Sequence, residues 1–393
     1  MKFKINALFL TNILSKFFSK NFSSTTLFQD LVFVVEKKQI TILVENKNFS
    51  INGCIFEKEI NGLKIFSPGI FSVNFKKHFL EITKNYNDEI EFEIKNGLLV
   101  IKNNKDLDWF TIPVNNSDND DYYSKIALQE NGQSLLINAS DFGKLINNVC
   151  LAIDNLSECK ATIFRLQLEG NFLFLWAQNH TSLVQEFLKV NNTDQLNFDF
   201  VLQPEYLDLI TNLNFANPND IFVSKNQDKI YLQQDNLVFQ INNTESVEIY
   251  FDEIPKVNYD KGLTIEKKTF SDALKKACAI FNFSEKNQDQ ITLEISEEQI
   301  IFKTFNKEDE KAFVVISKEN YYYKDIEFKI SLNYYELQKA VAFLQNKIHI
   351  CFAGQKDPVL VKSLDLPNHY HFIKSEYEQQ AHNCCLNAKD NSG

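Results

Sequence analysis

The chain has 393 residues, a formal net charge of −11 and seven cysteines. Hydrophobic residues make up 44% and charged residues 24% of it, which excludes a disordered polymer and points to two or three globular domains. The net negative charge argues against nucleic-acid binding by the protein surface as a whole. It does not exclude binding by lysines that are concentrated on one inner surface.

The first residues, Met1 to Lys4 followed by an apolar stretch, superficially resemble an export signal. Asn6 and Asn12 interrupt the apolar run, and the stretch reads well as an amphipathic helix. No window reaches the roughly 18 apolar residues that a membrane span needs. We therefore expect a cytoplasmic protein with no membrane partner, whose cysteines are mostly small buried hydrophobes.

The predicted elements repeat in the same order along the chain. Helical spacing of apolar residues predicts a first helix over 6–20, 139–154 and 269–283, and a second helix over 68–85, 204–214 and 333–346. Alternating β-branched and aromatic residues predict strands that include 40–44, 89–94, 221–223, 291–295 and 348–352.

The copies recur at intervals of roughly 130 residues, near the usual domain size. The polar run 115–121 and the segment 256–261 after Pro255 separate them. The sequence thus predicts an α+β chain with domains over 1–120, 121–256 and 257–378 and a flexible tail over 379–393. Each domain would pack two helices on antiparallel sheets.

This repeat order resembles that of the bacterial sliding clamp, the beta subunit of DNA polymerase III. Local matches are the opening Met1 to Ile5, Ala177 and Leu183 in the second repeat, Pro358 to Val361, and Tyr370 to Ile373. The resemblance covers the chain up to about residue 375. It implies a head-to-tail homodimer that closes into a ring with helices lining the hole.

The resemblance also implies a function. The chain would be a non-catalytic processivity factor that encircles duplex DNA and tethers the replicative polymerase, with the DNA polymerase III alpha subunit and the clamp loader as partners. No cofactor is implied. Basic residues on the helices would touch phosphates without reading sequence. The candidates for this DNA-facing role are Lys16, Lys20, Lys76, Lys77, Lys84, Lys144, Lys160, Lys275, Lys276 and Lys339.

In the family, partners insert a short peptide into an apolar cleft between the second and third domains. The positions that carry this role over are Ala177, Leu183, Pro255, Pro358, Phe372 and Ile373. The alternative is that these are core residues. For ring closure, an edge strand with Trp109, Phe110 and Ile112 could meet Ile280 and Phe281 of a second copy, unless these side chains are buried within their own domains.

Catalytic motifs are not found: the sequence has no phosphate-binding glycine loop, no nucleophile elbow and no His-Glu-x-x-His. His369 and His371 share one strand face, a pattern that is more often structural than metal-binding, so we expect no metal site.

Two other functions stay open. Gln178 to Ser182 stand where clamps carry Thr-Asp-Gly-His-Arg, and Lys374 stands where they carry Pro, which suits a divergent clamp-like protein without the standard polymerase partnership. The Phe- and Asn-rich strands and the acidic charge also suit a β-rich surface protein.

Overall fold

The computed structural model describes residues 1–18, 28–57, 62–74, 77–103, 109–114, 133–153, 162–213, 219–226, 228–242, 258–281, 290–305, 310–324 and 327–375. The chain divides into two compact units. The first unit holds residues 1–144, 166–173 and 189–246, and the second holds residues 145–165, 174–188 and 247–393. Helices and antiparallel sheets make both units, so the predicted α+β class is confirmed.

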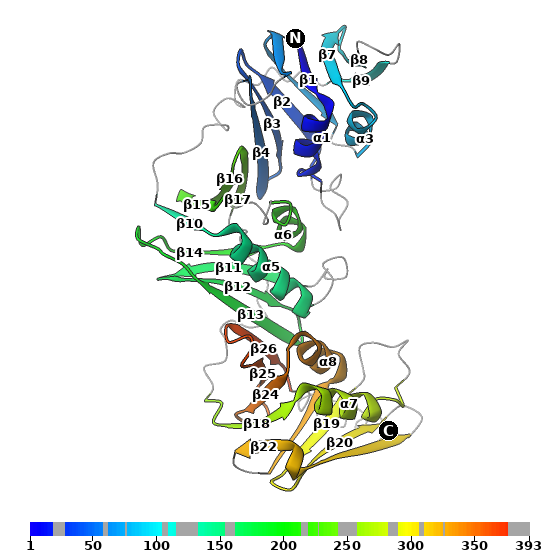
Figure 1. Ribbon diagram of the computed structural model, residues 1–393, viewed down its shortest axis with the longest axis vertical. Coiled ribbons are helices and arrows are strands. Elements are labelled where there is room, and N and C mark those ends of the chain that lie inside the picture. Colours follow the sequence, from blue (N-terminus) through cyan, green and yellow to red (C-terminus); the bar gives the residue numbers. More distant parts are fainter. Residues whose placement is uncertain are drawn as a thin grey trace, which may run out of the picture. The chain divides into compact units, whose positions relative to one another are not determined.

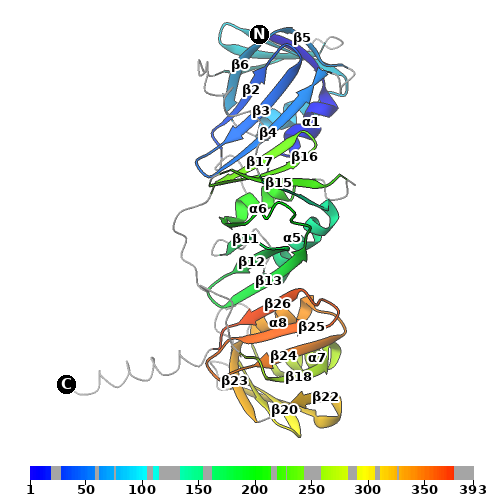
Figure 2. The same cartoon turned by 90° about the vertical axis from the view of Figure 1, so that its left-hand side faces the viewer.

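The first unit contains a five-stranded sheet in the order β5-β1-β7-β8-β9 and an eight-stranded sheet in the order β10-β15-β16-β17-β4-β3-β2-β6 (Figures 1 and 2). Its elements are β1 (Lys2–Asn6), α1 (Ala7–Ser15), β2 (Asp30–Val35), β3 (Gln39–Glu45), β4 (Phe49–Phe56), β5 (Lys64–Ser67), β6 (Gly69–Asn74), α3 (Lys77–Lys84), β7 (Glu89–Lys95), β8 (Leu98–Asn103), β9 (Trp109–Pro113), β10 (Ser134–Ile137), β14 (Phe198–Leu202), α6 (Pro204–Ile210), β15 (Ile221–Asn226), β16 (Lys229–Gln234) and β17 (Leu237–Asn242).

The second unit contains a run of paired strands in the order β13-β26-β25-β24-β18-β22 and a four-stranded sheet in the order β21-β20-β19-β23. Its elements are β13 (Ser182–Lys189), β18 (Lys261–Glu266), α7 (Lys267–Ala277), β19 (Gln290–Ile295), β20 (Gln299–Phe305), β21 (Lys311–Ser317), η3 (Lys318–Asn320), β22 (Tyr321–Lys324), β23 (Phe328–Asn333), α8 (Tyr334–Phe343), β24 (Lys347–Phe352), β25 (Val359–Ser363) and β26 (His369–Ile373). β13 contributes its last residue, Lys189, to the first unit, and three further elements, α5 (Ala139–Ile153), β11 (Ile163–Glu169) and β12 (Phe172–Gln178), also contribute residues to both units.

Strand pairing between repeats explains why the compact units do not follow the sequence repeats. In the first unit β4 of the first repeat pairs with β17 of the second, and in the second unit β13 of the second repeat pairs with β26 of the third. Backbone hydrogen bonds therefore run across the boundaries that composition suggested. The three-domain division stays a prediction.

A helix forms in each of the six places where helical spacing predicted one, but several ends differ. The largest difference is at 68–85, where residues 69–74 form strand β6, paired with β2, and the helix begins only at Lys77. Phe71 and Val73 face the core on alternate positions, so the strand period of two applies there.

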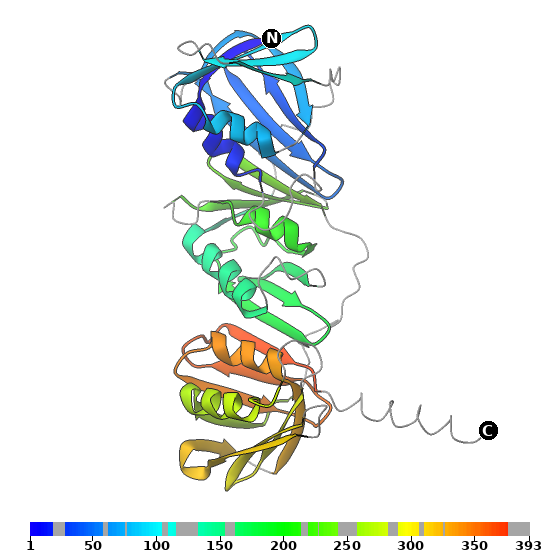
Figure 3. The same cartoon turned by 90° about the vertical axis from the view of Figure 1, so that its right-hand side faces the viewer.

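Helices of one repeat lie side by side on one face of their sheets. In the first unit α1 packs against α3, and in the second α7 packs against α8 (Figure 3). The core of the last repeat lies beneath α7 and α8 and includes Phe270, Leu274, Leu337 and Val341. Within the described residues, no helix is both long and apolar enough to cross a membrane.

Candidate functional site

Three buried side chains of the second unit, Leu183, Leu360 and Phe372, form a small apolar group that we call the docking cluster. Leu183 of β13 lies opposite Phe372 of β26, and Leu360 of β25 lies opposite Phe372 on its other side. Residues opposite each other in neighbouring strands point to the same face of the sheet, so the three side chains meet there.

Partly buried Trp176, Tyr259 and Tyr370 surround the docking cluster. The ring of Tyr259 lies 6.2 Å from that of Phe372, and its hydroxyl donates a hydrogen bond to the carbonyl oxygen of Pro358 at 3.1 Å. Burial raises the pKa of the Tyr259 hydroxyl, which keeps it protonated as a donor. A buried apolar centre with aromatic neighbours suits a peptide that anchors Leu or Phe side chains.

The structure brings some of the predicted cleft residues together and separates others. Leu183 and Phe372 are adjacent, and Pro358 is tied to them through Tyr259. Ile373 instead belongs to the core of the last repeat, because neighbours along a strand point to opposite faces. Ala177 is fully buried outside the docking cluster, and Pro255 lies outside the described residues.

Sequence reasoning missed Leu360, Trp176 and Tyr259 as members of this site. Leu360 lies two positions after Pro358, a predicted cleft residue, so the alternation of side chains along a strand could have found it. Tyr259 follows a chain junction, where no periodicity operates, so only the fold brings it to Phe372.

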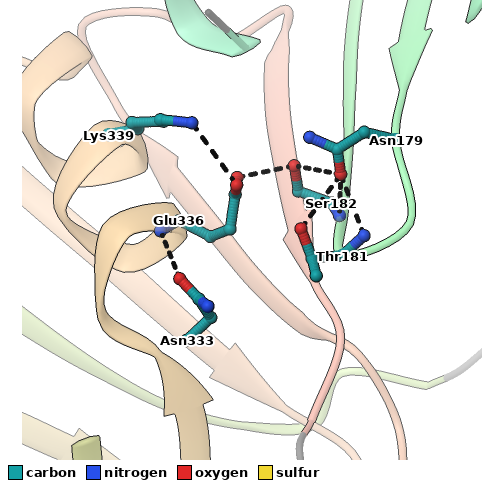
Figure 4. A network of polar contacts seen from close by, with 6 residues as sticks. All are labelled: Asn179, Thr181, Ser182, Asn333, Glu336 and Lys339. Atoms are coloured by element: carbon teal, nitrogen blue, oxygen red, sulfur yellow. Dashed lines mark hydrogen bonds and ion pairs between the residues drawn. The ribbon is translucent and has the colours of Figure 1, made fainter. Parts of the chain in front are cut away.

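A buried polar network holds the start of β13, beside the docking cluster (Figure 4). The Asn179 side-chain oxygen accepts hydrogen bonds from the backbone N–H groups of Thr181 at 2.9 Å and Ser182 at 2.8 Å, which closes the turn before β13. The Ser182 hydroxyl donates to the Glu336 carboxylate of α8 at 2.7 Å. Lys339, one turn along α8, contacts the other carboxylate oxygen at 3.4 Å.

This network satisfies a carboxylate that is only 6% exposed. An isolated charge there would cost several kcal/mol, so Glu336 depends on the Ser182 hydroxyl and the Lys339 ammonium. The arrangement joins α8 to the residue that directly precedes Leu183. Its polar residues stand where the resemblance expects the family's Asp-Gly-His-Arg turn.

The opposite face of the same strand pair carries two histidines. The His369 Nδ1 atom lies 2.9 Å from the Glu186 carboxylate, and the ring of Phe343 stacks on His369 with centroids 4.5 Å apart. His371 is fully buried, and neither of its ring nitrogens has a hydrogen-bond partner among the described residues. Among the described residues, no group of three or more His, Cys, Asp or Glu side chains could hold a metal ion.

The predicted DNA-facing lysines fall into three groups. Lys84 and Lys144 are exposed on α3 and α5, but each pairs with an acidic residue of its own helix, Glu81 at 2.9 Å and Asp141 at 3.2 Å. Lys275 and Lys276 are exposed near the end of α7, and neither has an ion-pair partner in the described part of the chain. The others are half-buried (Lys16 and Lys339), located by backbone only (Lys77), or outside the described residues (Lys20, Lys76 and Lys160).

Of the predicted lysines that the structure describes, Lys275 and Lys276 of α7 are the two that are exposed and have no ion-pair partner among the described residues. Sequence reasoning missed Lys268, which is also exposed on α7. Lys267, at the start of the same helix, instead donates hydrogen bonds to the carbonyl oxygens of Ala342 and Leu344. Lys267 thereby supplies donors to backbone carbonyl groups at the C-terminal end of α8, where a helix itself offers none.

Among the edge strands that expose large apolar side chains in the described part of the chain are β9 and β21. β9 ends the five-stranded sheet of the first unit, with Trp109 64% and Phe110 37% exposed. β21 ends the four-stranded sheet of the second unit, with Phe313 56% and Val315 54% exposed. An exposed apolar edge is a place where another strand adds.

Ile280 and Phe281, which were predicted to contact β9 of a second copy, are half-buried and buried, respectively. Phe281 is buried and packs against the ring of Tyr334 at 5.7 Å, and Ile280 is half-buried against the same core. Phe281 therefore follows the alternative of burial within its own domain. The exposed apolar edge in the last repeat is that of β21.

Comparisons with known proteins agree with this architecture. Residues 253–373 match the family model of the DNA polymerase III beta subunit, C-terminal domain. A search of curated proteins gives no match. The fold is similar to that of the DNA polymerase sliding clamp from Bacillus subtilis, at 17% identity and a TM-score of 0.76 over 95% of this chain and 98% of that one.

Two further solved structures are similar over the same share of this chain. The DNA polymerase III beta subunit from Thermotoga maritima matches at 16% identity and a TM-score of 0.73, with 98% of its own length covered. The DNA polymerase sliding clamp from Caulobacter crescentus matches at 13% identity and a TM-score of 0.75, with 99% covered. Residues 253–373 thus match the C-terminal domain of DNA polymerase III beta subunits, and the chain is similar in fold to the bacterial sliding clamps.

Proposed function

We propose that this chain is a sliding clamp, a non-catalytic processivity factor that encircles duplex DNA in the cytoplasm and tethers a replicative polymerase. The observation that carries the proposal is the clamp fold over 95% of the chain, combined with a family match in its last repeat. A topological link needs no catalytic residue and no sequence readout, so a protein of net charge −11 can perform it.

Ring closure is proposed to join two copies head to tail. The β9 edge of one copy would pair with the β21 edge of the other, which would cover Trp109, Phe110, Phe313 and Val315. Two such contacts, related by a twofold axis, close a ring and leave neither edge exposed.

The docking cluster is proposed to receive a linear peptide of the polymerase alpha subunit or of the clamp loader. Leu183, Leu360 and Phe372 offer the apolar floor, and Tyr259 and Trp176 the aromatic wall. We favour this partnership over a clamp-like protein without it, because the cluster forms although the polar turn beside it differs from the family pattern.

The test uses the full-length protein and nicked circular DNA. Light scattering after size exclusion should give a dimer. The dimer, loaded by its own clamp loader, should stay on the circle through gel filtration and leave it once the DNA is cut to a linear form. Retention that does not depend on DNA topology, or a monomer that cannot be loaded, would overturn the proposal. Location at the cell surface would favour the β-rich surface protein instead.

A further inference from the structure

One arrangement of three residues occurs twice in the chain. Helices α1 and α5 begin at Ala7 and Ala139, each after an asparagine whose side chain caps the helix. Lys16 and Asn148 are the ninth residues after these alanines. Lys16 and Asn148 thus occupy equivalent positions.

The strand pair beside each helix also corresponds. Gly53 of β4 lies opposite Leu237 of β17 in the first unit, and Glu186 of β13 lies opposite His369 of β26 in the second. Each residue of the second set follows its counterpart by 132 or 133 positions, the same interval that separates the two helices. Both sets are therefore copies of one structural position.

In the second unit a carboxylate fills this position. Glu186 accepts a hydrogen bond from the side-chain amide of Asn148 at 2.8 Å, and its other oxygen lies 2.9 Å from the imidazole of His369.

In the first unit the equivalent space, between helix α1 and the strand pair, is a cavity of about 210 Å³. Lys16, Gly53 and Leu237 line it, together with Phe9, Ile13 and Cys54. Its polar margin comes from Asn12, from Gln234 at the end of β16, and from Asp235 and Asn236 of the turn between β16 and β17.

Gly53 prevents the chain from supplying its own carboxylate there. A Cβ atom on Gly53 would lie 3.1 Å from the ring of Phe17 and 3.3 Å from Ile13, so a longer side chain would push helix α1 away. The half-buried ammonium of Lys16 has no ion-pair partner among the described residues. A cation beside an apolar cavity is complementary to an anion with an apolar body.

We infer that this cavity binds a small carboxylic acid with an apolar body. The carboxylate would contact Lys16, as Glu186 contacts Asn148 in the other copy, and the body would pack on Phe9, Ile13 and Leu237. A dry cavity of about 150 Å³ holds benzene, so this one suits a single ring or a short alkyl chain. Bound there, the acid would tie α1 to the turn between β16 and β17. The inference is independent of the proposed clamp function.

Asp235 is the one acidic residue among those that line the cavity. It is exposed, and its carboxylate accepts a hydrogen bond from the side chain of Asn219 at 2.7 Å. Should it dominate the electrostatics, the cavity would prefer an amine. The choice between acid and amine is therefore one outcome of the test.

The test compares phenylacetate, hexanoate and benzylamine as probes of the full-length protein by ligand-observed NMR titration. Phenylacetate and hexanoate should bind, and each should slow the reaction of Cys54 with a thiol reagent, followed at that residue by peptide mass spectrometry. Lys16→Met should weaken binding by about tenfold or more, the loss of one charge-assisted hydrogen bond, while Lys16→Arg retains it. Ile13→Trp should fill the cavity and abolish binding.

Lys144→Met is the matched control, since Lys144 is an exposed lysine on the equivalent helix and is not among the residues that line the cavity. Circular dichroism checks the fold of Ile13→Trp, and the half-exposed Lys16 variants keep the test decisive if that variant unfolds. Stronger binding of benzylamine, equal binding by Lys16→Met and wild type, or no protection of Cys54 would each overturn the inference.

Discussion

His371 is fully buried, and its imidazole has no hydrogen-bond partner in the part of the chain that the structure describes. Burial lowers its pKa to about 3, and the charges of His369 and Lys339 act in the same direction. The imidazole is thus neutral in the folded protein, whereas in the unfolded chain it takes up a proton below its ordinary pKa of about 6.5. Its contribution to stability is complete above that pH and is lost as the pH falls from there towards 3.

We predict that His371→Leu stabilises the protein and flattens this pH dependence. Removing two unsatisfied buried nitrogens should raise the free energy of unfolding by about 1–3 kcal/mol at neutral pH. The gain should grow on acidification, because the wild type loses up to roughly 1.4 kcal/mol per pH unit in this window. Urea unfolding of both proteins at neutral and mildly acidic pH measures the effect, with the exposed His180→Gln as control. Parallel pH profiles for wild type and His371→Leu would contradict it.

Ser182 supplies the hydroxyl that the buried Glu336 carboxylate requires. Ser182→Val should reduce the free energy of unfolding by about 1.5–3 kcal/mol, the value of a hydrogen bond to a charged group. It should also weaken polymerase binding, because the turn at Asn179 loses its tie to α8 beside Leu183.

Ser182→Thr is the matched variant, because Thr and Val have the same shape and Thr retains the hydroxyl. Denaturant unfolding and surface plasmon resonance with the purified alpha subunit should place the Thr variant close to wild type. Equal losses in both variants would mean that crowding at this buried position, and not the hydrogen bond, is responsible.

At the scale of elements, β9 and β21 are edge strands that expose large apolar side chains. Phe110→Asp or Val315→Asp should convert the dimer to monomer, because a carboxylate in the middle of a paired apolar edge would be buried without a partner. Analytical ultracentrifugation measures the change. Tyr322→Asp is the control, as Tyr322 is exposed on a different edge strand, β22. A dimer that persists in both edge variants would exclude these strands as the interface.

Helix-strand ambiguity explains the element that the sequence misassigned. Residues 68–85 contain apolar residues at spacings that suit a helix, yet 69–74 pair with β2 as a strand. A short apolar run fits either period, and the neighbouring strand decides which is adopted.

At the scale of the whole molecule, a protein with a net charge of −11 needs a locally cationic surface to contact DNA. Lys275 and Lys276 of α7 have no acidic partner among the described residues, whereas Lys144 pairs with Asp141. We predict that the double substitution Lys275→Glu/Lys276→Glu weakens DNA binding. It should also reduce the slope of log affinity against log salt concentration by the contribution of about two phosphate contacts. Fluorescence anisotropy with duplex DNA over a range of salt measures this. Lys144→Glu, the control, should change both quantities less, and an equal effect would mean that α7 is not the main contact.

The α+β class and the places of the helices, apart from the strand at 69–74, were predictable from the sequence alone, because the apolar spacing of a helix is local. Leu183 and Phe372 were also identified from the sequence, through matches to the family. Only the tertiary structure decided that Tyr259 joins the docking cluster, that Leu183 meets Phe372, and that β21 exposes apolar side chains at a sheet edge. These features depend on which strands pair and in which register, and contacts between residues far apart in the sequence set that pairing, which no local pattern encodes.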